Sequence, residues 1–322
     1  MARKITFAEF RDAVAARRQQ VVQLAQEGNA EALAALGPLG TFVEFDPDAP
    51  LPRLRFREDA FLDEPPAEID VDKEFYRIVQ EAENARDRSK AKDPNKPRVL
   101  AEGDSWCYLP SSCPGVPSAI GNRLTNNNLY DCKNIGWYGH TLVRILADRQ
   151  HLDELTKEET HYFFLSAGGN DLVDQLAAGG VLHDYDPGRP ADKYLTSQGH
   201  ACLNQIEADY NTLLAEVGAK FTRLKTLCFG YDYPRPLVAK GKYIGRHLKK
   251  LGIPDSAADS IIQPVVELLG VKIQQAATRN GARYVNCLNV TRDFAWWDDM
   301  HPHDDGFNAL ESKIAQAISG WS

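Results

Sequence analysis

Short apolar runs alternate with segments of helical periodicity from residue 98 to the end of the sequence. The runs cover residues 99–101, 132–135, 162–165, 226–229 and 284–288. Apolar residues at three- and four-residue steps mark helices within 203–217 and 307–317. Strands that alternate with helices form a parallel sheet covered on both faces. The sequence therefore predicts an α/β fold, and its functional groups are expected in the loops at the carboxyl ends of the strands.

Residues 1–97 have a different pattern. Thr6 and Glu9 have the spacing of a capping box and precede an amphipathic helical stripe, and a second helix is expected near residues 75–82. Between them, residues 44–72 are rich in acids and prolines, and residues 53–57 alternate like an edge strand. The charged segment 89–97 ends this region. We predict a helical, wrapping extension over 1–97, whose helices pack on the chain itself, bind a partner protein or form a homo-oligomer.

Composition excludes several classes of protein. The chain has 322 residues, of which 43% are hydrophobic and 25% are charged, as in globular proteins. Its net charge of −8 has the wrong sign for extensive phosphate contacts, so we predict no nucleic-acid partner. No apolar run is long enough to span a membrane, and the charged start does not resemble a signal peptide, so a cytoplasmic location is predicted.

The six cysteines include no C-x-x-C pair, which favours free buried thiols over a zinc or dithiol site. A disulfide between Cys107 and Cys113 is the alternative, against which a reducing cytoplasm argues.

Four segments that follow predicted strands, or lie near the C-terminus, carry chemistry-bearing residues. Ser105 lies in Gly-Asp-Ser-Trp after the first strand, Gly139 follows the second, and Asn170 follows a glycine pair after the third. A serine there can be a nucleophile, and the glycine N–H and the asparagine amide can stabilise an oxyanion. Each motif also has an ordinary structural explanation, since glycines form turns and asparagines cap helices.

The fourth segment contains Asp298 and, three residues later, His301. Imidazole is a suitable base for a serine hydroxyl at neutral pH, and a carboxylate can orient it. The surrounding acids and histidines could alternatively bind a metal ion, but no known metal-ligand spacing is present, and the aspartates suit a helix N-terminus. We therefore predict neither a metal nor another cofactor.

In this order, the four segments resemble the blocks of the SGNH (GDSL-like) hydrolases. The resemblance spans about residues 98–322 and implies a flavodoxin-like three-layer α/β/α fold with a mostly parallel five-stranded sheet. It implies that Ser105 is the nucleophile, His301 the general base and Asp298 its orienting carboxylate. The oxyanion hole would then comprise the N–H groups of Ser105 and Gly139 and the side chain of Asn170.

The chain departs from the family pattern in two respects. Tryptophan follows the serine where the family has leucine, and lid-like insertions are expected around 177–199 and 231–252. The second insertion carries a basic run, 240–250, which is either a solvated helix face or a lid that attracts an anionic substrate. The residues expected to contact substrate are Asp104, Trp106, Tyr231, Asp232 and Trp297.

The predicted activity is hydrolysis of a carboxylic ester through an acyl-enzyme on Ser105. Aromatic residues gather in the site segments, so the substrate is expected to be a small-molecule ester with a short acyl group or a carbohydrate O-acetyl group. Acyl transfer by the same triad and a non-enzymatic interaction protein on a hydrolase scaffold are the alternatives.

Overall fold

The computed structural model describes residues 95–109, 111, 116–127, 129–237 and 241–321. Before residue 95 it describes only residues 4–6, 8–10, 12, 16, 43–46, 53–56, 62 and 80. Nearly all of the region with predicted α/β alternation is therefore described, whereas most of residues 1–97 lie outside the described part.

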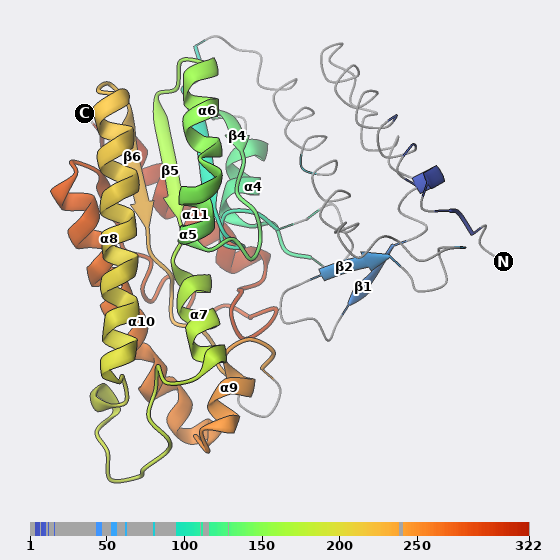
Figure 1. The fold of residues 1–322 in the computed structure, drawn as a ribbon. Coiled ribbons are helices and arrows are strands. Elements are labelled where there is room, and N and C mark those ends of the chain that lie inside the picture. The colour runs from blue at the N-terminus through green and yellow to red at the C-terminus, as the bar shows by residue number, and fades with distance from the viewer. Residues whose placement is uncertain are drawn as a thin grey trace.

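A five-stranded parallel sheet forms the centre of the molecule (Figure 1). Its strands are β3 (Arg98–Gly103), β4 (Asp131–Asn134), β5 (Tyr162–Ser166), β6 (Lys225–Phe229) and β7 (Arg283–Val285). They are arranged in the order β4-β3-β5-β6-β7, and each neighbouring pair is parallel. The predicted fold class is confirmed, and all five predicted strands are present.

The last strand is shorter than predicted. It ends at Val285, although the apolar run continues to Leu288. The N–H of Leu288 bonds instead to the side chain of Asn286, and the N–H of Val290 bonds to the carbonyl of Cys287. These local turn bonds replace the strand ladder, and they direct the chain toward the segment that carries His301.

Helices cover both faces of the sheet, with α8 in front and α11 behind it in Figure 1. The long helix α8 packs against α10, α7 and α5, and α11 packs against α4. The described helices are α4 (Ile120–Asn126), α5 (Leu142–Asp148), α6 (Gln150–Lys157), α7 (Gly169–Ala178), η3 (Ala191–Lys193), α8 (Ser197–Lys220), α9 (Gly245–Lys250), α10 (Asp255–Arg279) and α11 (Asp304–Ser319). The predicted apolar stripe of α8 is buried along its length, because this side of the helix faces the hydrophobic core.

Helix α10 is absent from the sequence-based prediction. It has 25 residues and continues through Pro264. A proline inside a helix removes the hydrogen bond to the carbonyl four residues earlier, here that of Ser260. Ser260 is exposed, so water can bind its carbonyl, and the buried face of α10 holds the helix against α8 and β7.

The N-terminal expectations are tested at only a few residues. The capping box is confirmed, since the Thr6 and Glu9 side chains each accept a hydrogen bond from the other residue's N–H, at 3.1 and 2.9 Å. The predicted edge strand is β2 (Arg53–Phe56), which pairs antiparallel with β1 (Val43–Asp46). The predicted second helix lies outside the described residues except at Gln80, which is helical.

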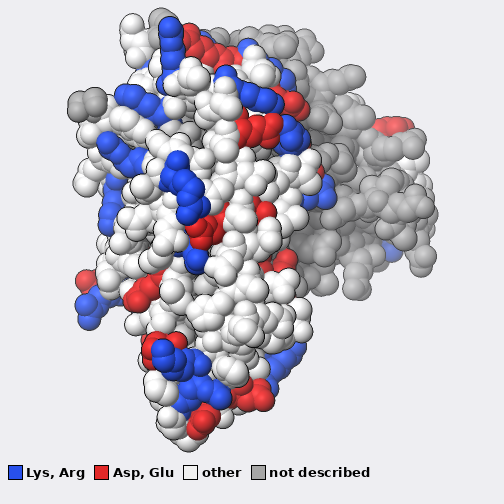
Figure 2. Space-filling model, turned by 60° about the vertical axis from the view of Figure 1, so that its left-hand side comes forward, with Lys and Arg blue, Asp and Glu red and all other residues white. Residues whose placement is uncertain are grey.

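The predicted free thiols are confirmed for the five cysteines in the described part of the chain, and Cys113 lies outside it. None of the helices in the described segments is both long and apolar enough to cross a membrane. On the face drawn in Figure 2, basic and acidic side chains are interspersed over the described residues.

Candidate active site

Ser105 lies in the tight turn that follows β3. The turn is held by Asp104, whose N–H donates to the carbonyl of Ser166 and whose carboxylate accepts the N–H of Trp106. Gly103 permits this geometry because a β-carbon there would lie 2.2 Å from the Ser166 oxygen. Contacts with the end of β5 thus fix the position of the turn that carries Ser105.

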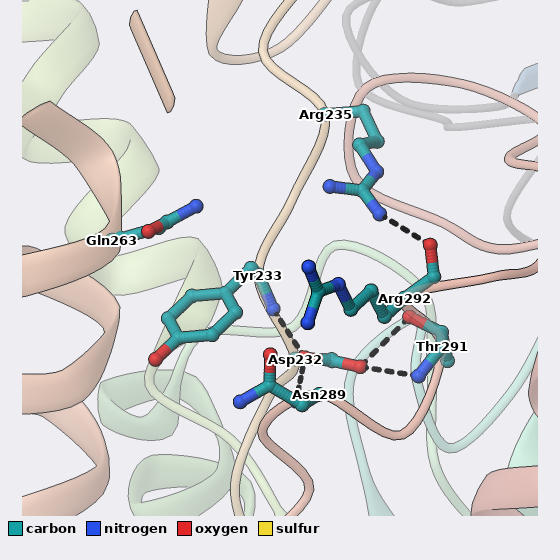
Figure 3. Close-up of a pocket in the computed structure, with 7 residues that line it drawn as sticks. All are labelled: Asp232, Tyr233, Arg235, Gln263, Asn289, Thr291 and Arg292. Atoms are coloured by element: carbon teal, nitrogen blue, oxygen red, sulfur yellow. Dashed lines mark hydrogen bonds between the residues drawn. The ribbon is translucent and has the colours of Figure 1, made fainter. Parts of the chain in front are cut away.

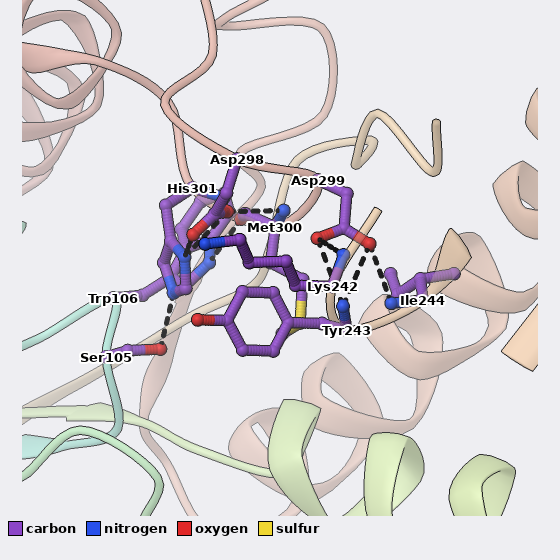
Figure 4. A network of polar contacts seen from close by, with 9 residues as sticks. All are labelled: Ser105, Trp106, Lys242, Tyr243, Ile244, Asp298, Asp299, Met300 and His301. Atoms are coloured by element: carbon purple, nitrogen blue, oxygen red, sulfur yellow. Dashed lines mark hydrogen bonds and ion pairs between the residues drawn. The ribbon is translucent and has the colours of Figure 1, made fainter. Parts of the chain in front are cut away.

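His301 reaches Ser105 from the opposite end of the sequence (Figure 4). Its Nε2 lies 2.7 Å from the Ser105 Oγ, and its Nδ1 lies 2.8 Å from an Asp298 carboxylate oxygen. Asp298 also accepts the backbone N–H groups of Met300 and His301, at 2.7 Å each. The carboxylate therefore fixes both the loop and the ring, and the three predicted residues form one continuous hydrogen-bonded chain.

The electrostatics of His301 suit a base. Burial lowers its pKa, but the charge and hydrogen bond of Asp298 and the charges of Asp104 and Asp299 together raise it by more, so the net shift is upward from 6.5. Its ring is fully buried and Ser105 is 1% exposed, so water does not weaken these contacts.

The three predicted oxyanion donors lie in the turn after β3, the loop after β4 and the first turn of α7. Neither the Ser105 N–H nor the Gly139 N–H donates a hydrogen bond to another described residue. Gly139 has a φ of +77°, a conformation that favours glycine. One hydrogen of the Asn170 amide is held by the carbonyl of His140 at 3.0 Å, which leaves the second hydrogen for another acceptor.

Asp104 and Tyr231, both expected to contact substrate, bond to each other. The Tyr231 hydroxyl donates to the Asp104 carboxylate and accepts the N–H of Gly169 at 3.0 Å. Asp104 is 1% exposed, and burial raises its pKa to about 6 against the opposing effect of the Tyr231 bond. The pair ties the nucleophile turn to the β5 loop, and its contact with substrate stays a prediction.

The two tryptophans expected at the site differ in position. Trp106 is buried, packs against Tyr231 and Phe307, and donates its indole N–H to the Met300 carbonyl. It braces the His301 loop from within, and its expected contact with substrate stays a prediction. Trp297 is only partly buried and its ring lies 6.1 Å from that of His301, where it can border a substrate.

Asp299 and Tyr243 are missing from the sequence-based site. The buried Asp299 carboxylate accepts the N–H groups of Lys242, Tyr243, Ile244 and Gly245 (Figure 4). This holds the Tyr243 ring perpendicular to the His301 ring, with centroids 5.8 Å apart. Asp299 could have been noticed as the neighbour of Asp298, but no sequence signal indicates its partners, because they lie more than 50 residues away.

Some residues of the basic run 240–250 lie on the surface, and one lies next to the active site. Lys249 and Lys250 are exposed on α9, as a solvated face requires, whereas Lys242 is half-buried and adjoins Tyr243. Lys240 lies outside the described residues. Within the described chain, no three histidine, cysteine or acidic side chains are grouped so that they could hold a metal ion, and Asp298 and Asp299 are turned to backbone and His301 partners.

We compared the chain with known proteins, and the solved structures to which it is similar include lipases and an esterase. No protein-family model and no curated protein sequence matches the chain. Among solved structures it is similar to an extracellular lipase from Streptomyces rimosus, with 13% identity and a TM-score of 0.46 over 69% of this chain and 99% of that one. A putative GDSL-like lipase from Parabacteroides merdae has 14% identity and a TM-score of 0.45 over 70% and 96% of the two chains.

A variant of an acetyl-xylooligosaccharide esterase from Geobacillus is similar at 17% identity, with a TM-score of 0.41 over 70% and 95% of the two chains. Since these TM-scores lie below 0.5, the likenesses decide nothing about the activity of this chain, which must be argued from its own residues.

Proposed function

We propose that the protein is a serine ester hydrolase of the SGNH type. The observation that carries the proposal is the continuous contact from Ser105 Oγ through His301 to Asp298, at 2.7 and 2.8 Å. A hydroxyl, an imidazole and a carboxylate in this order are the groups that nucleophilic acyl transfer uses.

In the first half of the reaction, His301 Nε2 takes the Ser105 proton while Oγ attacks the ester carbonyl carbon. The carbonyl oxygen becomes negative and is stabilised by the N–H groups of Ser105 and Gly139 and the Asn170 amide. Imidazolium, stabilised by Asp298, then protonates the departing alcohol. An acyl group remains on Ser105.

In the second half, His301 removes a proton from water, which attacks the acyl carbon through a second oxyanion. The proton then returns to Ser105 Oγ, and the carboxylic acid leaves. Because each proton moves only between His301 and an adjacent oxygen, the reaction needs no cofactor.

For the substrate we propose a short acyl ester or a carbohydrate O-acetyl group. Trp137 and Tyr138 stack with ring centroids 5.4 Å apart on the loop that carries Gly139, and Trp297 borders His301. Large rings in the segments that carry the site residues favour a small acyl group, and flat aromatic faces also suit a sugar. Activity against 4-nitrophenyl esters should therefore fall steeply from acetate to octanoate.

The direct test is replacement of the nucleophile. Ser105→Ala should reduce kcat for 4-nitrophenyl acetate by a factor on the order of 10³ or more, with little change in the melting temperature. Ser260→Ala removes an exposed hydroxyl on α10 and is the matched control, with activity expected at the wild-type level. Wild-type activity in Ser105→Ala would overturn the proposal.

A further inference from the structure

A polar cavity of about 410 Å³ lies beyond the carboxyl ends of β6 and β7 (Figure 3). Neither the triad nor the oxyanion donors line it. Its walls come from the loop after β6, the loop after β7 and helix α10, and they consist of Asp232, Tyr233, Arg235, Gln263, Asn289, Thr291 and Arg292.

The acidic group of the cavity is already satisfied by the protein. The Asp232 carboxylate accepts the N–H groups of Tyr233, Asn289 and Thr291, at 2.6 to 2.7 Å, and the Thr291 hydroxyl at 2.8 Å. Asp232 is 2% exposed, and its bonds within the protein join the two loops. Its expected contact with a substrate stays a prediction.

The two basic groups are not neutralised in this way. Arg292 is an exposed residue of the loop after β7. Figure 3 shows its guanidinium extending into the space beside Tyr233 and above Asn289. Within the described residues, neither Arg292 nor Arg235 forms an ion pair with a carboxylate. Arg235 is held in place by the Arg292 carbonyl, at 2.9 Å, and by the face of Trp296, at 5.8 Å.

Amide side chains complete the lining. Gln263 points toward the arginines from α10, and Asn289 lies below the arginines, next to Asp232, in Figure 3. Guanidinium groups bind planar carboxylates and phosphates with paired hydrogen bonds, and neutral amides supply further donors without adding charge. The cavity thus offers several donors, and its one carboxylate, Asp232, is already hydrogen-bonded within the protein. This combination favours a negatively charged ligand.

We propose that this cavity binds the oxyanion group, phosphate or carboxylate, of a small organic molecule, with Arg292 as the main contact and Arg235 beside it. The volume exceeds that of a bare phosphate, so the ligand carries an organic part as well. The ligand is either a separate molecule or the anionic end of the ester substrate. None of the cavity's lining residues belongs to the triad, and only the case in which the ester substrate supplies the anion rests on the proposed esterase activity.

Isothermal titration of the full chain with inorganic phosphate and with succinate tests the site. Arg292→Gln should weaken binding of at least one of these anions tenfold or more, and Arg292→Lys, which keeps the charge but loses the paired donors, should weaken it less. The control Arg223→Gln removes the same charge from an exposed position before β6, at the other end of the sheet, and should bind like the wild type. Equal binding by all variants, or no binding by the wild type, would overturn the proposal.

Ester hydrolysis then distinguishes the two sources of the anion. If the substrate supplies it, Arg292→Gln should raise KM for a 4-nitrophenyl hemisuccinate at least tenfold and leave KM for 4-nitrophenyl butyrate unchanged. If a separate molecule supplies it, both KM values stay at the wild-type level while phosphate or succinate binding is lost. Failure of the esterase proposal would abolish both hydrolysis signals and leave the titration unaffected.

Discussion

Asp298 determines the pH range in which His301 can act as a base. Burial alone would lower the His301 pKa, and the charge and hydrogen bond of Asp298, together with the charges of Asp104 and Asp299, reverse the shift. Only neutral imidazole accepts the Ser105 proton, so kcat/KM should rise as the pH passes upward through the raised pKa. The same carboxylate then stabilises the imidazolium that forms during the reaction.

Asp298→Asn should therefore change both rate and pH dependence. Without the negative charge the His301 pKa falls, so the acid limb of kcat/KM moves to lower pH, and kcat falls by a factor on the order of 10³–10⁴. A pH profile with a neutral ester measures both effects. An acid limb at the wild-type position would show that Asp298 does not control the base.

Glu102 is a second residue whose ionisation is coupled to the fold. It lies in β3, is 3% exposed, and its pKa is raised to about 8 because burial outweighs the hydrogen bond from Gly103. Between about pH 4.5 and 8 the folded chain keeps a proton that the unfolded chain releases. The free energy of unfolding should therefore fall as the pH rises through this window.

Glu102→Gln tests this coupling, since the amide resembles the protonated acid. The variant should lose less stability than the wild type between pH 5 and pH 8 in urea unfolding, and Asp104, with its pKa of about 6, should leave a residual slope. The exposed Glu159→Gln is the control and should retain the wild-type slope. Identical slopes in Glu102→Gln and the wild type would rule out a proton held at Glu102.

At the scale of elements, the His301 loop and the segment 242–245, which leads into α9, form one unit. Trp106 supports the loop through Met300, and the Asp299 carboxylate accepts the N–H groups of that segment. A carboxylate that accepts several N–H groups from one segment acts like a helix cap, and its loss leaves buried donors unpaired. Tyr243 is placed beside His301 by these bonds.

Asp299→Asn should loosen this unit, because the amide places its own donors against backbone donors. We expect faster hydrogen exchange at the amides of 242–245, a loss of about 1–3 kcal/mol in the free energy of unfolding and a lower kcat/KM. Asp305→Asn, on the exposed first turn of α11, is the control. Unchanged exchange at 242–245 would show that Asp299 does not hold the segment.

At the scale of the whole molecule, the parallel sheet was predictable because its strands are buried on both faces and read as apolar runs. The positions of Ser105, Gly139, Asn170 and His301 were predictable because each follows a strand or belongs to a recognisable block. Helix α10 was not, since Pro264 interrupts the local signal while tertiary packing overrides it. The Arg235–Arg292 cavity was not, because it depends on loops that meet only in the folded chain.

Burial of the triad is also a property of the whole molecule. Ser105 and His301 are almost completely covered, and Gln80, from the N-terminal region, donates a hydrogen bond to the Gly136 carbonyl on the loop that leads to Gly139. An ester therefore reaches the serine only when covering residues move.

Labelling with a fluorophosphonate, followed by peptide mass spectrometry, tests the nucleophile most directly. Only a serine activated by a base should react at neutral pH, so the folded chain should gain one adduct, on Ser105, and His301→Ala should lose it. An adduct on another residue, or none on the folded wild-type chain, would contradict the assignment of Ser105 as the nucleophile.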